Sequence, residues 1–183
     1  IGQIDNCYII ATDGTGLFII DQHAAHERIL YDKFGKNSDR IPSQQLLMQI
    51  FMDLSEKECE FINNNKDVFV NLGFTMEQAG PNSMRLLEVP ADVPVSEVEN
   101  IIKEILESLE NLYDVSAKEL RHQALQITAC KAAIKSGDKL NLTQMNIIIE
   151  ELNNTVLPYT CPHGRPSIIK FSSSELAKMF KRT

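Results

Sequence analysis

The chain has 183 residues, of which 43% are hydrophobic and 23% are charged, and this is the composition of a folded globular protein. No apolar run approaches the roughly 20 residues that a membrane-spanning helix needs, so we expect no membrane partner. The net charge of −7 argues against a strong, sequence-independent DNA-binding protein. The acidity is concentrated in residues 39–119, which hold 6 Lys or Arg and 16 Asp or Glu, whereas residues 120–183 hold 9 and 4.

The first forty residues combine a hairpin with a helix. A turn signal at residues 13–16 separates two apolar runs, so residues 3–20 are predicted to form a β-hairpin. The periodicity then changes to one that suits a helix, which is predicted to begin at Asp21 and to end near Gly35. A polar linker is predicted over residues 35–42.

The acidic middle of the chain has its own alternation of strands and helices. Capping boxes, in which a serine is followed three residues later by a glutamate, predict helices that begin at Ser55 and Ser96. The first of these helices is expected to run to Asn71. Three strands are also predicted, over residues 46–54, 74–78 and 84–89.

The last third of the chain is predicted to hold three helices and one strand. They cover residues 117–136, 141–153, 167–171 and 172–182. Two of the helices begin with capping boxes, at Asn141 and Ser172, and the longest is closed by Gly137. The chain as a whole is therefore expected to have an α+β fold.

The start of the first helix could bind a metal. Asp21 can cap the first free backbone N–H groups of the helix. His23 and Glu27 are four residues apart and therefore lie on one helical face. A carboxylate, an imidazole and a second carboxylate thus gather at one strand-to-helix junction. The same residues could also form a capped helix with a surface salt bridge, and this stretch alone leaves both interpretations open.

A second group of candidate ligands lies near the other end of the chain. Cys161 and His163 are two residues apart, so in an extended segment both side chains point to the same side. Thiolate and imidazole are preferred ligands of zinc. Cys130, within a predicted helix, is a third candidate. The remaining cysteines, Cys7 and Cys59, lie in apolar patterns and are expected in the core.

These segments resemble the C-terminal domain of the bacterial MutL mismatch-repair family in its endonuclease-bearing form. The chain reads Asp-Gln-His-Ala from residue 21, then Glu27, and then Asp32 where the family pattern has a second Glu. It also has Ala-Cys-Lys at residues 129–131 where the family has Ala-Cys-Arg, Cys-Pro-His-Gly-Arg-Pro at residues 161–166, and a terminal Phe-Lys-Arg. The resemblance covers essentially the whole chain, and the first and third motifs are long and specific.

The resemblance implies an architecture and a set of partners. A discontinuous dimerisation subdomain would comprise residues 1–38 and 117–183 and carry the metal site, and an acidic α/β regulatory subdomain, residues 39–116, would be inserted in it. The protein would be a cytoplasmic homodimer that acts in DNA mismatch repair with the mismatch-recognition protein MutS and the replication sliding clamp. ATP would bind only to a missing N-terminal part, and a start at Ile1 rather than Met fits a fragment.

The candidate ligands are too many for one tetrahedral zinc ion. They are His23, Glu27, Cys130, Cys161 and His163. They could serve two neighbouring ions, with Asp21 completing a site or orienting a water, so that Asp21, His23 and Glu27 carry catalysis. Two-metal centres suit phosphodiester hydrolysis because one ion activates the water and the other stabilises the leaving oxygen. Zinc is expected on the Cys/His side and manganese or magnesium at the carboxylates, in a DNA-nicking endonuclease that is weak in isolation. The alternative is a dimerisation module whose zinc is only structural.

Three further positions have roles that the residues leave open. Asp32 lies roughly 140° around an ideal helix from Glu27, so a salt bridge or a contact with a ligand is predicted rather than metal binding. Lys131 could contact a DNA phosphate or be an ordinary solvated helix residue. Arg165 could hold a DNA phosphate or a local carboxylate.

Residues 43–49 resemble the segment by which this family docks on the sliding clamp. The contacts would come from Gln44, Leu46, Leu47 and Met48. Gln49 stands where a proline is usual. An ordinary strand is the alternative.

Overall fold

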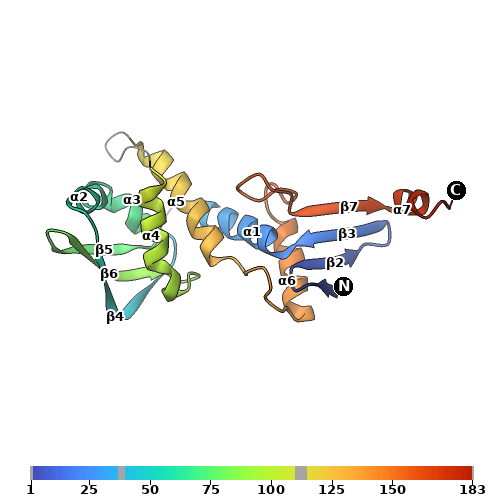
Figure 1. Ribbon diagram of the computed structural model, residues 1–183, viewed down its shortest axis with the longest axis horizontal. Helices are drawn as coiled ribbons and strands as arrows, with labels where there is room; N and C mark the ends of the chain where they lie inside the picture. The colour runs from blue at the N-terminus through green and yellow to red at the C-terminus, as the bar shows by residue number, and fades with distance from the viewer. Residues whose placement is uncertain (1, 37–39, 110–114, 183) are drawn as a thin grey trace. The chain divides into compact units, whose positions relative to one another are not determined.

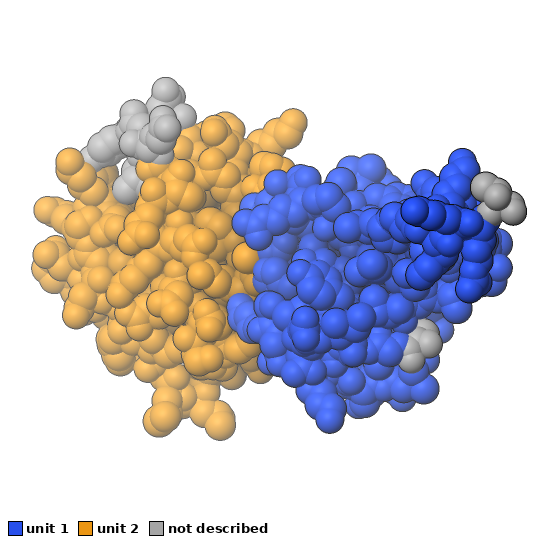
Figure 2. Space-filling model, turned by 45° about the vertical axis from the view of Figure 1, so that its right-hand side comes forward, with its two compact units in different colours: residues 1–32, 133–183 blue, residues 33–132 orange. Residues whose placement is uncertain are grey.

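The computed structural model describes residues 2–36, 40–109 and 115–182, which form helices and two antiparallel sheets (Figure 1). The α+β prediction is confirmed. The chain divides into two compact units, drawn in different colours in Figure 2: unit 1 comprises residues 1–32 and 133–183, and unit 2 comprises residues 33–132. Across the described residues, no helix is both long enough and apolar enough to cross a bilayer.

Unit 1 contains a four-stranded sheet in the order β1-β2-β3-β7, together with α6, α7 and most of α1. The bounds are β1 Gly2–Ile4, β2 Tyr8–Thr12, β3 Gly16–Asp21, α1 Gln22–Lys36, α6 Leu142–Asn153, β7 Ile168–Ser172 and α7 Ser173–Met179. Ile9 on β2, Ile20 on β3 and Ile168 on β7 are directly opposite one another, so they share one face. They pack with apolar residues of α1 and α6 to form the core of the unit.

The predicted hairpin is part of a three-stranded meander. Residues 5 and 6 have positive φ angles, and they turn the chain so that β1 can pair with β2. The β2–β3 turn uses Gly14 at φ +85°. Gly16 begins β3 in close approach to β7, where a Cβ atom would lie 2.4 Å from the carbonyl oxygen of Phe171. A side chain at that position would therefore push the strands apart.

Unit 2 contains a three-stranded sheet in the order β4-β6-β5, together with α2, α3, α4, α5 and the last residues of α1. The bounds are β4 Ser43–Asp53, α2 Glu56–Asn64, α3 Lys66–Asn71, β5 Thr75–Gly80, β6 Ser83–Pro90, a 3₁₀ turn Val95–Glu97, α4 Val98–Glu107 and α5 Ala117–Ala132. Its core contains Met52 and Met84 from the sheet and Ile101, Ile102 and Ile105 from α4, all fully buried. α5 contacts α4 and α3, so it belongs to this unit.

The two units do not coincide with the predicted subdomain boundaries. Residues 33–36 and α5 are grouped with unit 2, whereas the predicted boundaries are at residues 38/39 and 116/117. The first of these boundaries, and part of the predicted linker, lie outside the described residues. The dimerisation and regulatory roles of the two parts stay predictions.

Capping boxes predict helix starts well, with one exception. Those at Ser55, Asn141 and Ser172 are all present, each with both reciprocal hydrogen bonds. The prediction at Ser96 is wrong, because the N–H of Glu97 donates to the carbonyl of Pro94 and closes a 3₁₀ turn there. α4 therefore begins two residues later, after Glu97, without a side-chain cap.

Two predicted helices are too long. The helix expected to run from Ser55 to Asn71 is broken at Asn65, whose side chain donates to the carbonyl of Phe61 and ends α2. The helix expected to end at Gly137 stops at Ala132. The N–H of Ile134 donates to Nδ1 of His26 at 2.9 Å instead of continuing the hydrogen bonds of the helix. The other element boundaries shift by a few residues.

The two cysteines expected in the core differ in their burial. Cys59 is buried, as predicted. The prediction for Cys7 is wrong, because it is half-buried in the turn before β2 and its sulfur lies 2.9 Å from the hydroxyl of Ser136. The chain turns at residues 5 and 6, which moves Cys7 out of the alternation that predicts its burial.

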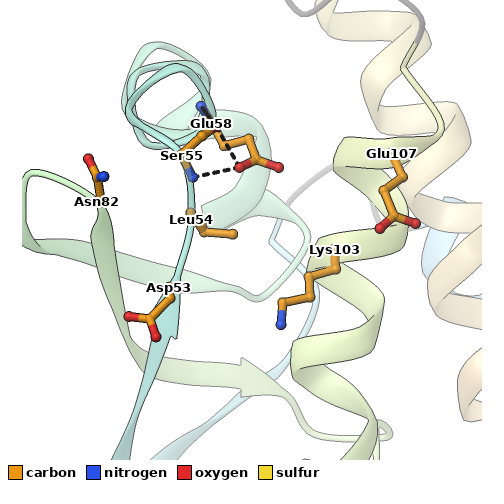
Figure 3. Close-up of a pocket in the computed structure, with 7 residues that line it drawn as sticks. All are labelled: Asp53, Leu54, Ser55, Glu58, Asn82, Lys103 and Glu107. Carbon is orange, nitrogen blue, oxygen red and sulfur yellow. Dashed lines mark hydrogen bonds between the residues drawn. The ribbon is translucent and has the colours of Figure 1, made fainter.

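A hollow of about 460 Å³ opens on the surface of unit 2 (Figure 3). Its lining includes Ser55, Glu58 and Lys103. Ser55 and Glu58 form the capping box of α2, and Lys103 pairs with Glu99 at 2.7 Å. Local structure therefore accounts for these polar groups.

Candidate metal centre

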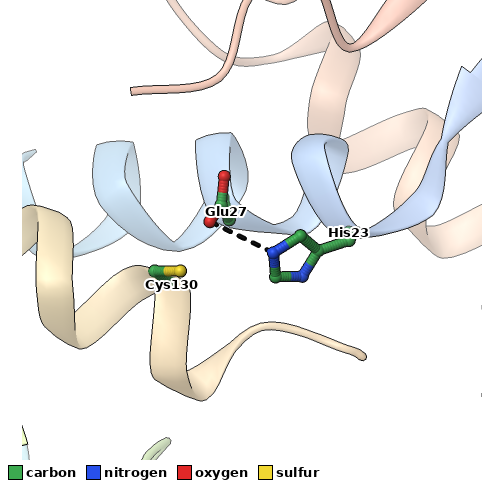
Figure 4. Close-up of side chains that lie close together, drawn as sticks. All are labelled: His23, Glu27 and Cys130. Carbon is green, nitrogen blue, oxygen red and sulfur yellow. Dashed lines mark ion pairs between the residues drawn. The ribbon is translucent and has the colours of Figure 1, made fainter. Parts of the chain in front are cut away.

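The start of α1 holds the first candidate ligands. β3 passes directly into α1 at Asp21, whose Oδ1 accepts a hydrogen bond from the N–H of Ala24 at 3.0 Å. The predicted helix cap is therefore present. One turn further on, Nε2 of His23 lies 3.3 Å from Oε1 of Glu27 (Figure 4).

The carboxylate of Glu27 lies between two imidazoles. Its other oxygen, Oε2, is 3.6 Å from Nδ1 of His163. The ligand atoms of Glu27, Cys161 and His163 all lie within 4.8 Å of one another. Glu27 is only 3% exposed, and a carboxylate so far from water is costly unless a cation or hydrogen-bond donors balance it. A thiol, an imidazole and a buried carboxylate form a donor set that fits a divalent metal, and His23 lies at the other oxygen of the same carboxylate.

The environment of His23 determines which ring nitrogen can bind a metal. Its Nδ1 lies 2.9 Å from the carbonyl oxygen of Ile134. A carbonyl can only accept, so Nδ1 carries the proton, and Nε2 faces Glu27. Two acceptors at that distance repel unless a proton or a metal lies between them. Metal-binding histidines usually donate their second N–H to a carbonyl or carboxylate in this way.

His26 and Gln22 anchor the same segment, and sequence reasoning did not predict their roles. The N–H of Ile134 donates to Nδ1 of His26 at 2.9 Å, so the two histidines engage both sides of one residue. Gln22 is fully buried, and its amide nitrogen donates to the carbonyls of Asn6 and Lys135. A polar residue on the apolar face of a predicted helix is the sequence signal that could have revealed the role of Gln22.

Cys161 and His163 lie in a closed loop. A β-bridge joins Thr160 to Pro166, and the N–H of Cys161 donates to the carbonyl of Arg165 at 2.8 Å. The turn is completed by Gly164, whose φ of +80° favours glycine. Cys161 is buried, whereas His163 is exposed. The loop thus presents a buried thiol and a solvent-accessible imidazole to the same carboxylate.

Burial, together with the nearby Glu27 carboxylate, raises the pKa of the Cys161 thiol above its ordinary value. Without a metal, this cysteine is therefore protonated at neutral pH. A metal that binds the sulfur as thiolate must release that proton. Affinity for a metal should consequently rise with pH.

The remaining predicted site residues are Cys130, Lys131, Arg165 and Asp32. Cys130 is on α5 of unit 2 (Figure 4), and its role as a ligand stays a prediction. Lys131 forms a salt bridge with Glu104 at 2.8 Å, which raises the lysine's pKa. Arg165 is exposed. Of the two alternatives for Asp32, the salt bridge is present, with Arg28 at 3.2 Å.

Comparison with known proteins gives one consistent result. The model of the family described as the MutL C terminal dimerisation domain matches residues 1–140. The DNA mismatch repair protein MutL of Clostridium botulinum (strain Loch Maree, type A3) is 40% identical over 184 residues, which cover 100% of this chain and 28% of that protein. MutL of Clostridium beijerinckii is 43% identical over 185 residues, with the same two shares. The chain thus spans under a third of the length of these relatives.

Proposed function

The chain belongs to the MutL C-terminal dimerisation domain family, and from this premise we propose that it is the homodimerisation part of a DNA mismatch-repair protein and carries a metal-dependent DNA-nicking site. One observation carries the nicking proposal. The buried carboxylate of Glu27 has His23 at one oxygen and His163 at the other, with Cys161 beside it.

In the proposed site, some residues bind metal and others orient a ligand or the attacking water. Cys161, His163 and Glu27 would hold zinc, with Cys130 as a further proposed ligand, and the carboxylates of Glu27 and Asp21 would favour manganese or magnesium. When bound, a metal would supply Lewis acidity to the phosphodiester and lower the pKa of water. The Ile134 carbonyl orients His23. Oδ1 of Asp21 is engaged in the cap, so we assign Oδ2 to orienting the attacking water.

Replacing Cys161 with Ser should lower zinc affinity by at least about tenfold, because a strong thiolate ligand is replaced by a weak hydroxyl. Elemental analysis and zinc titration of the purified chain measure this directly. Cys59→Ser is the matched control, because Cys59 is equally buried but lies in unit 2. Wild-type protein that neither retains nor binds zinc contradicts the metal proposal.

The open face of the unit 1 sheet supports the homodimer proposal. Ile10, Ile19 and Ile169 are directly opposite one another on β2, β3 and β7, on the side away from the core. Neighbouring strand positions add apolar side chains to this open face; they are Ile4, Tyr8, Leu17 and Phe171. All seven side chains are partly or fully exposed in the single chain. A contiguous apolar patch of this kind favours burial against a second copy of the same surface.

Binding of DNA, MutS, the sliding clamp and, through the rest of the protein, ATP belongs to the proposed function of the full-length protein, as does a cytoplasmic location. The distribution of charge predicts that this chain alone binds DNA only weakly. Residues 39–119 carry a net charge of −10 and would repel phosphates, whereas residues 120–183 carry +5. Nicking by the isolated chain should therefore be slow.

The candidate clamp-docking segment lies on β4, at the edge of the unit 2 sheet. Pairing with β6 is irregular between Gln45 and Ile50. Leu47 and Met48 lie in this interval, and their side chains are 105% and 85% exposed. Two fully exposed apolar side chains on an irregular edge strand support a docking role over that of an ordinary strand.

The double substitution Leu47→Ala and Met48→Ala should weaken clamp binding at least tenfold, because docking would bury both side chains. Surface plasmon resonance with immobilised clamp measures the change. Because both residues are exposed, thermal unfolding should stay within a few degrees of the wild-type value. Val156→Ala, at another exposed apolar residue, serves as the control. An unchanged affinity would remove this segment from the clamp interface.

A further inference from the structure

Arg28 and Asp32 form a buried ion pair on α1, one turn apart. Nη1 of Arg28 lies 3.2 Å from Oδ1 of Asp32, and the two residues are 7% and 8% exposed. Burying two charges is costly, and a pair with one such contact does not recover that cost unless the remaining polar atoms are also hydrogen-bonded. The positions of those other atoms therefore indicate what the pair does.

Each side chain also uses one further atom on the backbone of a single loop. Nε of Arg28 donates to the carbonyl of Thr160 at 2.7 Å. Oδ2 of Asp32 accepts from the N–H of Val156, also at 2.7 Å. The pair thus forms hydrogen bonds to both ends of segment 156–160. Thr160, at one of these ends, immediately precedes Cys161.

Few apolar side chains anchor segment 156–160, which Ser167 also holds through hydrogen bonds to the carbonyls of Pro158 and Tyr159. The side chains of Val156, Leu157 and Tyr159 are 75%, 56% and 60% exposed. Hydrophobic packing therefore contributes little to its position, and hydrogen bonds to its backbone must supply most of the restraint. Asp32 reaches the amide of Val156 directly, at the position where the family pattern has the longer Glu.

We propose that Arg28 and Asp32 are positioning residues that hold segment 156–160 and thereby place Cys161 and His163 beside Glu27. This inference rests on the proposed metal site, but it concerns residues that do not bind the metal. α1 then supplies both sides of the arrangement. His23 and Glu27 face the proposed metal, and Arg28 and Asp32, each five residues further along the helix, fix the loop that brings the other ligands.

The test separates positioning from folding with two variants and a control. In the double variant Arg28→Met with Asp32→Leu, apolar side chains of similar size replace both charges, so no unpaired charge is buried. Asp32→Asn keeps the shape but removes the charge. Ile148→Ala, in the core of unit 1, lowers stability but leaves both members of the ion pair in place. Zinc affinity is measured by competition with a chromophoric chelator, and unfolding by circular dichroism.

The double variant should unfold no earlier than Ile148→Ala yet bind zinc about ten- to a hundredfold more weakly, as is usual when residues that orient ligands are lost. Asp32→Asn should show a smaller loss. Ile148→Ala should bind zinc like the wild type. A folded double variant with wild-type zinc affinity would overturn the inference and assign the pair to stability alone.

Hydrogen exchange in the metal-free chain decides the inference even if zinc never binds. The amides of Cys161 and Ser167 are hydrogen-bonded within the loop and not to the ion pair. If Arg28 and Asp32 position the loop, these amides should exchange at least tenfold faster in the double variant, and at the wild-type rate in Ile148→Ala. Unchanged exchange at both amides overturns the positioning role. Absence of zinc binding in the wild type would instead count against the proposed function.

Discussion

Replacing Asp21 with Asn in the full-length protein should slow manganese-dependent nicking of supercoiled plasmid by about a hundredfold, the lower range for loss of a positioned catalytic carboxylate. Asn keeps the size of the side chain and an oxygen that can accept from the N–H of Ala24, so the cap on α1 survives. Only the negative charge is lost. The variant should therefore unfold like the wild type and retain zinc, while nicking falls.

Asp13→Asn is the matched control for this substitution. Oδ1 of Asp13 also accepts a backbone hydrogen bond, from the N–H of Thr15 at 2.8 Å, and the residue lies in unit 1 in the β2–β3 turn. It should nick at the wild-type rate. If Asp21→Asn does so too, Asp21 is a helix cap without a catalytic role.

The wild-type result separates the two candidate functions. Nicking that needs added manganese while zinc is retained supports a site with two kinds of ion. A wild-type protein that binds zinc and dimerises but never nicks, even with the clamp present, supports the alternative, a dimerisation module with a structural zinc. Full-length protein is needed because this chain alone is expected to bind DNA weakly.

Sequence reasoning succeeds where the relevant contacts are local. The cap at Asp21, the His23–Glu27 pair and the capping boxes at Ser55, Asn141 and Ser172 join residues within four positions of one another, so spacing alone predicts them. The closeness of Cys161 and His163 to Glu27 is not local, and only the family resemblance suggested it.

The interactions that sequence reasoning missed join distant residues. The two histidine contacts with Ile134 span more than a hundred residues, and they explain why α5 ends before Gly137. The contacts of Arg28 and Asp32 with the loop are equally remote. Their helical spacing predicts the salt bridge between them, but no spacing indicates which backbone groups the other atoms will reach.

Replacing Ile169 with Asp should largely abolish the homodimer. Ile169 is 51% exposed on the open sheet face, where the proposed interface would bury it. A carboxylate left unpaired at a buried site costs about 3 kcal/mol or more, and a two-fold interface buries two copies. The combined cost of about 6 kcal/mol corresponds to a dissociation constant raised by about ten thousandfold. A dimer with a nanomolar dissociation constant would become monomeric at micromolar concentration.

Sedimentation equilibrium over a range of concentrations measures this change. Ile147→Asp is the control, because Ile147 is 47% exposed but lies on α6, outside the open sheet face. It should leave the dimer intact. Circular dichroism checks that both variants fold, which is expected because both side chains are already about half exposed. A dimer that survives Ile169→Asp unchanged would move the interface off this sheet face, and a wild-type protein that is monomeric at micromolar concentration would contradict the homodimer itself.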